Sequence, residues 1–112
     1  MTELLPTGKL RPDILKKIIE KAPVFDSNLI LGPGIGLDCG IVDTGSHYLV
    51  MKTDPITFAT EDIGWYAVQI AANDIATTGA VPKWMMVTAL FPEGKTTEAL
   101  VQQITDQLFE AA

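Results

Sequence analysis

One stretch of the sequence constrains the fold more than any other, the segment TEDIGWYAVQIAANDIATTGAVP at residues 60–82. Its apolar interior and the signals at both ends predict one helix. Thr60 can cap the start, and the two acidic residues that follow place negative charge in the first turn. Gly79 stands where a left-handed residue closes a helix, and Pro82 prevents the helix from resuming. The small side chains inside the segment allow such a helix to lie close to a sheet.

A polar pair, Asn73 and Asp74, interrupts this apolar helix. Most charged side chains stay in water, so one reading places Asp74 on the exposed side of the helix. However, the helix is apolar on nearly every side, and burying an unpaired carboxylate is costly. Further aspartates stand at the ends of predicted strands, at Asp38 and Asp54. Together these features favour a functional site over a solvent-exposed position for Asp74.

Composition and charge bound the class of protein. The 112 residues are enough for one compact domain, residues 1–112, and 47% of them are hydrophobic, so the chain can build a core. The net charge of −6 disfavours nonspecific binding to nucleic acid or to anionic membranes. The apolar runs are too short to span a bilayer, the N-terminus lacks the pattern of a signal peptide, and Cys39 is alone. The sequence therefore predicts a cytoplasmic protein that binds neither nucleic acid nor membrane.

Hydrophobic patterns and turn residues place the other elements. Pro12 suits the first position of a helix that Pro23 ends, and Thr96 or Thr97 can cap a last helix. Short β-prone runs predict four strands, of which the third is expected to be buried, at residues 28–31, 41–43, 48–53 and 83–91. This order predicts an α+β fold with a mixed four-stranded sheet and helices on one face.

Three further positions allow two interpretations each, as turns or as ligand sites. The glycine-rich run at residues 31–45 is either a hairpin or a loop that approaches a ligand at Gly36 and Asp38. Asp54 stands between a strand and a proline, so it is either a rigidly placed ligand or a turn residue. Lys9 ends a Thr-Gly-Lys run that can contact phosphate, although the rest of a P-loop is missing and an ordinary turn is the alternative.

Read together, three segments resemble the N-terminal domain of the aminoimidazole-ribonucleotide (AIR) synthetase-like superfamily. These segments are GPGIGLDCGIVD, LVMKTDPIT and IGWYAVQIAANDIATTGAVPKWMMVTALFPEG, and the resemblance covers residues 8–95. Its most specific part is the run Asn73–Ala76 followed by Gly79, Ala80 and Pro82. Within the superfamily the chain is most similar to thiamine-monophosphate kinase and to relatives of the hydrogenase-maturation carbamoyl dehydratase.

The resemblance implies an enzyme chemistry and a site. Members bind ATP with Mg²⁺ and activate an oxygen or selenium centre of a small-molecule or protein substrate by phosphoryl transfer. Their N-terminal domains pair, each giving four strands to a shared barrel, so the resemblance implies a homodimer. It also implies that three aspartates hold the metal and that three other residues contact the nucleotide. The metal ligands are Asp38, Asp54 and Asp74, and the nucleotide-binding residues are Lys9, Gly36 and Asn73.

Two departures from the family pattern leave the function open. Many relatives carry paired aspartates in the glycine-rich turn, whereas this chain has Leu37 before Asp38, so the number of metal ions is open. Relatives are also longer and use a C-terminal domain to complete the active site, so we expect no activity from this chain alone and identify no catalytic residue. The alternatives are a non-catalytic nucleotide- or metal-binding or dimerisation module of the same fold, and an unrelated structural α+β domain. The retained aspartates and Asn73 favour the enzyme, and Leu37 favours the module.

Overall fold

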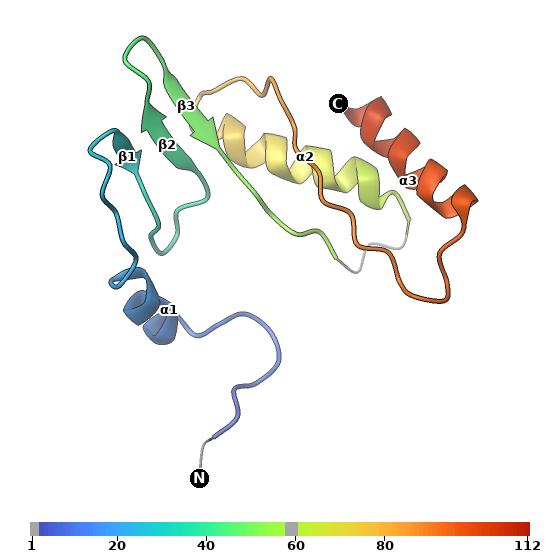
Figure 1. Cartoon of the computed structure of the whole chain (residues 1–112), viewed down its shortest axis with the longest axis horizontal. Coiled ribbons are helices and arrows are strands. Elements are labelled where there is room, and N and C mark those ends of the chain that lie inside the picture. Colours follow the sequence, from blue (N-terminus) through green and yellow to red (C-terminus); the bar gives the residue numbers. More distant parts are fainter. Residues whose placement is uncertain (1–2, 58–60) are drawn as a thin grey trace. The chain divides into compact units, whose positions relative to one another are not determined.

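The computed structural model describes residues 3–57 and 61–112, and the chain folds as two units, residues 1–49 and 50–112. The structure confirms the α+β class, with three helices and a three-stranded antiparallel sheet in the described residues (Figure 1). The elements in chain order are α1 (Pro12–Ile19), β1 (Leu29–Leu31), β2 (Gly40–Asp43), β3 (Tyr48–Met51), α2 (Ile63–Ala76) and α3 (Glu98–Ala111).

Helix α1 begins with proline at its first position, as the sequence predicts. The guanidinium of Arg11, the residue before the helix, donates two hydrogen bonds to the carboxylate of Asp13, at 3.0 and 2.8 Å. These hydrogen bonds lower the pKa of the Asp13 carboxyl. The helix ends at Ile19, earlier than the proline at position 23 requires, and Glu20 closes it in a helical conformation.

The sheet has the strand order β1-β2-β3, so neighbours in sequence are neighbours in the sheet. Strands β1 and β2 are antiparallel, and an irregularity between Leu29 and Leu31 shifts their register. The predicted turn between β2 and β3 is present. The backbone N–H and the hydroxyl of Thr44 both donate to the carbonyl of His47, at 2.9 and 2.7 Å, while Gly45 takes a positive φ of 94°. Local hydrogen bonds therefore fix this hairpin.

Two strand predictions differ from the structure. Residues 83–91 form no hydrogen-bonded strand in the described chain, so the fourth strand and the mixed sheet are not confirmed. The prediction that the third strand is buried is wrong: β3 ends at Met51, and its side chains include Tyr48 at 68% exposure. An apolar run predicts burial only where another layer covers it, and the sequence of the run does not say which surface that is.

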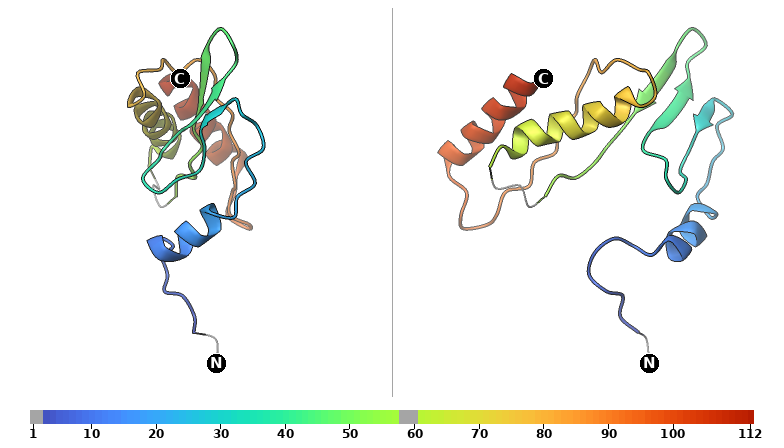
Figure 2. Two further views of the ribbon diagram at one scale, coloured as in Figure 1. Left: turned by 90° about the vertical axis from the view of Figure 1, so that its left-hand side faces the viewer. Right: turned by 180° about the vertical axis from the view of Figure 1, so that it is seen from behind.

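Helices α2 and α3 lie side by side in the second unit (Figure 2). They approach closely at Gly64, where a Cβ atom would lie 2.6 Å from the carbonyl oxygen of Ile104 and 3.0 Å from the backbone nitrogen of Leu108. The backbone N–H of Gly64 donates to the side-chain oxygen of Gln107 at 3.0 Å. This bond satisfies one of the N–H groups that a helix start leaves without an internal partner. Leu108 is buried beside this contact.

The ends of the helices test the predicted start and stop signals. Thr60 lies outside the described residues. The predicted acidic first turn of α2 is wrong, because Asp62 precedes the helix with a φ of 56° and its side chain makes no cap hydrogen bond. At the other end, Gly79 has the predicted left-handed conformation, with a φ of 82°, and its N–H donates to Ala76 at 3.0 Å. The hydroxyl of Thr97 caps α3 by accepting from Leu100 at 3.1 Å.

The contact at Gly64 predicts that Gly64→Ala destabilises the chain. The added methyl group overlaps backbone atoms of α3, so we expect a loss of about 1–3 kcal/mol, although alanine gains about 1 kcal/mol in helix propensity. Urea denaturation measures this change. Gly40→Ala is the matched control, because the nearest atom to its Cβ lies 3.8 Å away, and its change should stay within about 0.5 kcal/mol. Equal stability of the Gly64→Ala and native chains would show that the helices do not pack this closely.

Candidate functional site

Lys52, whose side chain is mostly buried, forms ion pairs with two of the predicted metal ligands. The ammonium nitrogen of Lys52 lies 2.8 Å from Oδ2 of Asp74 and 3.5 Å from Oδ2 of Asp54. The side chain of Lys52 is only 10% exposed, against 25% for Asp74 and 42% for Asp54. All three residues belong to the second unit. We call them the Lys52 cluster.

Different elements supply the residues of this cluster. Lys52 is the first residue after β3, and Asp54 follows two positions later. Pro55 restricts the backbone of Asp54 to extended conformations, which limits where its carboxylate can lie. Asp74 comes from the last turns of α2, and its backbone carbonyl accepts a hydrogen bond from the hydroxyl of Thr77 at 2.7 Å. The site thus depends on contact between the segment that leaves β3 and the body of α2.

The electrostatics of the cluster are asymmetric. The ammonium of a side chain with so little exposure requires a charged or polar partner, and the carboxylate of Asp74 provides one at hydrogen-bonding distance. Among the three groups, two carboxylates face one ammonium, so one negative charge is in excess. Such a cluster favours a further cation.

Lys52 is not among the site residues predicted from the sequence. The predicted ligands at this site are all carboxylates, whereas the ammonium of Lys52 lies 2.8 Å from Asp74 and 3.5 Å from Asp54. A signal was present in the sequence, because Lys52 ends an apolar run and stands two residues before an aspartate. Residues two apart in an extended segment share a face, so this spacing can place a lysine beside Asp54. The spacing alone does not show that Asp74 joins them.

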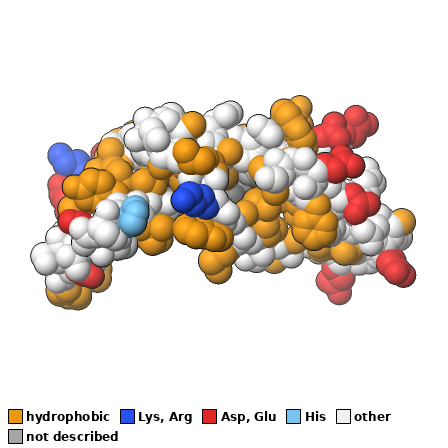
Figure 3. All heavy atoms as spheres, turned by 90° about the horizontal axis from the view of Figure 1, so that it is seen from above, with side chains coloured by type: hydrophobic (Ala, Val, Ile, Leu, Met, Phe, Trp, Pro, Cys, Tyr) orange, Lys and Arg blue, Asp and Glu red, His pale blue; other side chains and the backbone are white. Residues whose placement is uncertain are grey.

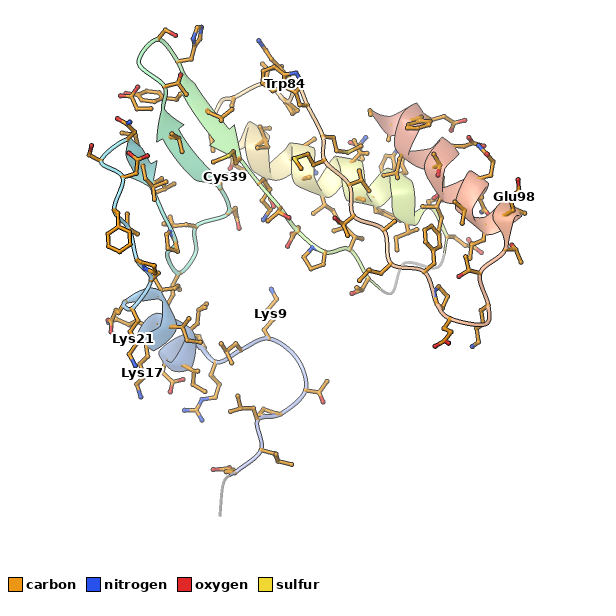
Figure 4. All side chains as sticks on the ribbon, viewed as in Figure 1. Lys9, Lys17, Lys21, Cys39, Trp84 and Glu98 are labelled. Atoms are coloured by element: carbon orange, nitrogen blue, oxygen red, sulfur yellow. The ribbon has the colours of Figure 1, made fainter. Side chains whose placement is uncertain are left out.

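Of the other predicted site residues, only Asn73 is next to the cluster in the chain. Asp38 and Gly36 are exposed in the loop before β2, where Gly36 has a positive φ of 76°. Lys9 is exposed on the segment before α1 (Figure 4). Asn73 is exposed on α2 beside Asp74. Within residues 3–57 and 61–112, no three side chains of the His, Cys, Asp and Glu types gather as a metal site. The role of Asp38 as a metal ligand stays a prediction.

The donor set of the cluster suits a magnesium ion. Mg²⁺ prefers hard oxygen ligands, and proteins commonly hold it through one or two carboxylates while phosphates and waters complete the shell. The Oδ2 atoms of Asp54 and Asp74 lie within reach of a single cationic group, the ammonium of Lys52. Two carboxylates that converge on one positive charge are a suitable starting geometry for such an ion.

Residues 36–112 match the sequence model of the family described as AIR synthase related protein, N-terminal domain, which is more than half of the chain. The chain belongs to this family. The whole Lys52 cluster, together with Gly36, Asp38 and Asn73, lies inside the matched residues, whereas Lys9 lies outside them. The family assignment made from the sequence segments is confirmed.

Curated relatives agree with this assignment. The chain is 29% identical to a thiamine-monophosphate kinase of Haemophilus influenzae in an alignment of 89 residues that covers 71% of the chain. It is 31% identical to a putative hydrogenase expression/formation protein of Methanocaldococcus jannaschii in an alignment of 116 residues that covers 93% of the chain. The chain spans only 26% of the length of the kinase and 34% of the length of the second relative. No solved structure matches the chain.

One structural finding bears on membranes. None of the helices in the described residues combines the length and the apolar character that crossing a bilayer requires.

The ion pair predicts the effect of Asp74→Asn on stability. Repulsion among carboxylates alone would leave the variant as stable as the native chain or more stable. The lysine reverses this expectation, because the substitution removes the carboxylate charge that lies 2.8 Å from the ammonium of Lys52. We expect a loss of about 1–3 kcal/mol in the free energy of unfolding, measured in urea without added metal.

Asp54→Asn is the matched control for this prediction. Its carboxylate lies farther from the ammonium and is more exposed, so the expected loss is under about 1 kcal/mol. An Asp74→Asn chain that is as stable as the native chain would contradict a structural role for the ion pair.

Proposed function

We propose that this chain is the N-terminal, ATP- and Mg²⁺-binding domain of an enzyme that transfers a phosphoryl group to an oxygen or selenium centre. The substrate is a small molecule or a protein-bound group. The family membership supports this proposal, as do the names of the relatives, which include a kinase and a hydrogenase expression/formation protein. The observation that carries it is the convergence of Asp54 and Asp74 on one positive charge.

The cluster has a defined role in this proposal. Asp54 and Asp74 hold Mg²⁺, with Asp38 as a further ligand, and Asn73, Gly36 and Lys9 contact the nucleotide. When bound, the metal neutralises charge on the phosphates and on the transferring phosphoryl group. The residues of the chain orient the ion and fix the position of the phosphates. In this proposal the chain supplies binding and orientation, whichever group accepts the phosphoryl.

The proposal includes a homodimer. Large apolar side chains are exposed along residues 81–90, with Trp84 (Figure 4) at 83%, Met86 at 99% and Leu90 at 93% exposure. Hydrophobic side chains are also prominent on the face of the molecule drawn in Figure 3. Soluble monomers rarely expose large contiguous apolar patches. Pairing with a second copy gives residues 83–91 a strand neighbour and covers these side chains, which is the shared barrel that the family resemblance implies.

A second candidate function rests on one residue. Leu37 occupies the position before Asp38, where many relatives carry another aspartate, and it supplies no metal ligand. A chain that lacks this ligand suits a module that binds nucleotide or mediates dimerisation without catalysis. The two candidates differ in whether Mg²⁺ and ATP bind together.

Thermal melts and calorimetry test the metal–nucleotide site. Mg²⁺ with ATP should raise the melting temperature of the chain more than ATP with a chelator does, because only the folded state holds the complex. Asp74→Asn should weaken Mg²⁺–ATP binding at least about tenfold, the loss of one good ligand. Asp106→Asn removes the same charge from an exposed position on α3 and should leave the affinity unchanged. Equal Mg²⁺–ATP affinities for the native chain and both variants, or no binding to the native chain, would favour the non-catalytic module.

Sedimentation equilibrium tests the dimer. At micromolar concentration the chain should have twice its own mass, because the apolar side chains at residues 81–90 lose contact with water on pairing. Met86→Glu places a charge in the proposed interface and should give a monomer. Leu4→Glu changes a similarly exposed apolar residue outside that segment and should remain dimeric. A native chain that sediments as a monomer would overturn this part of the proposal.

A further inference from the structure

The ammonium of Lys52 lies where a metal ion would meet its carboxylate ligands. It contacts Oδ2 of Asp74 at 2.8 Å and lies 3.5 Å from Oδ2 of Asp54. A magnesium ion binds carboxylate oxygens at about 2.1 Å. The ion and the ammonium would therefore compete for the same oxygen atoms, and two cations at such close range repel each other.

A displaced ammonium needs another partner. The Lys52 side chain is only 10% exposed, so an ammonium that leaves both carboxylates without reaching water pays a large desolvation cost. A phosphate group that arrives with the metal is a suitable anion, because lysine binds phosphate readily as a point charge. The two exchanges then favour each other, because the metal binds the carboxylates that the ammonium leaves and the phosphate pairs with the ammonium of Lys52.

We propose that Lys52 is an internal counter-ion that holds Asp54 and Asp74 in position until a divalent cation replaces it, and that then pairs with the incoming phosphate. This inference rests on the proposed function of the cluster. It makes Lys52 a positioning residue that couples two ligands. The metal alone binds weakly because it must displace the lysine, and ATP strengthens metal binding because it gives the lysine a partner.

Lys52→Met tests the competition. Methionine keeps an unbranched apolar side chain and removes the charge, so Mn²⁺ alone should bind at least about tenfold more tightly than to the native chain. The gain in Mn²⁺ affinity that ATP produces should shrink in the same variant. Lys52→Arg retains the charge and should not show the tighter binding. Electron paramagnetic resonance of free Mn²⁺ measures all of these affinities on the 112-residue chain.

The outcomes separate this inference from the proposed function. If the native chain binds Mn²⁺ with ATP but Lys52→Met binds Mn²⁺ no more tightly, the inference is wrong and the proposed function stands. If the native chain binds no Mn²⁺ and Lys52→Met does, the lysine is the competitor. If neither binds, both proposals are wrong.

A second measurement uses the native chain and does not depend on how a variant folds. Lys52 should react slowly with an amine-acylating reagent, faster when Mn²⁺ alone is added, and slowly again with Mn²⁺ and ATP. Lys95 is the reference, since it is exposed and lies outside the cluster. Mass spectrometry of the labelled peptides gives both rates. A Lys52 rate that does not rise with saturating Mn²⁺ would overturn the displacement.

Discussion

The contact between Lys52 and Asp74 joins the segment after β3 to helix α2. Each of the two charged side chains provides the opposite charge that the other needs. A carboxylate in an otherwise apolar helix needs a positive neighbour, and the ammonium of a lysine whose side chain is only 10% exposed needs a negative one. The pair fixes where Asp54 lies relative to α2, because Asp54 follows Lys52 by two residues. The candidate site therefore arises from the same interaction that docks the strand-end segment on the helix.

The apolar side chains of this protein contribute little to a core of its own. Among the described residues only Cys39 and Leu108 are buried apolar side chains, although 47% of the sequence is hydrophobic. Order in the described residues therefore depends on a few specific contacts, such as the local turn at Thr44 and the long-range packing of α2 on α3 at Gly64. A chain with this much exposed apolar surface gains stability when a second surface covers it, which is why the proposal of a homodimer follows from the fold as well as from the family.

The sequence predicted those features whose conformation depends on neighbouring residues in the chain, such as the ends of the helices. Pro12, Gly79 and Thr97 mark helix ends because their own backbone or side chain decides the conformation there. The strand predicted at residues 83–91 is not confirmed. A strand needs a neighbouring strand, and the sequence of the run does not specify one. Lys52 was missed for the same reason. Its role depends on Asp74, which is distant in sequence, and no periodicity within either segment reveals that the two meet.

Helix α2 supports two separate interactions along its length. Gly64 contacts α3 near the start of the helix, whereas Asp74 contacts Lys52 near its end. The helix rises about 1.5 Å per residue, so these two contacts are about 15 Å apart along its axis. Contacts at such a distance that share no partner contribute almost additively to stability. The chemistry of the Lys52 cluster can therefore change, by substitution or by exchange of one cation for another, while the packing of α2 on α3 stays intact and continues to hold the helix in place.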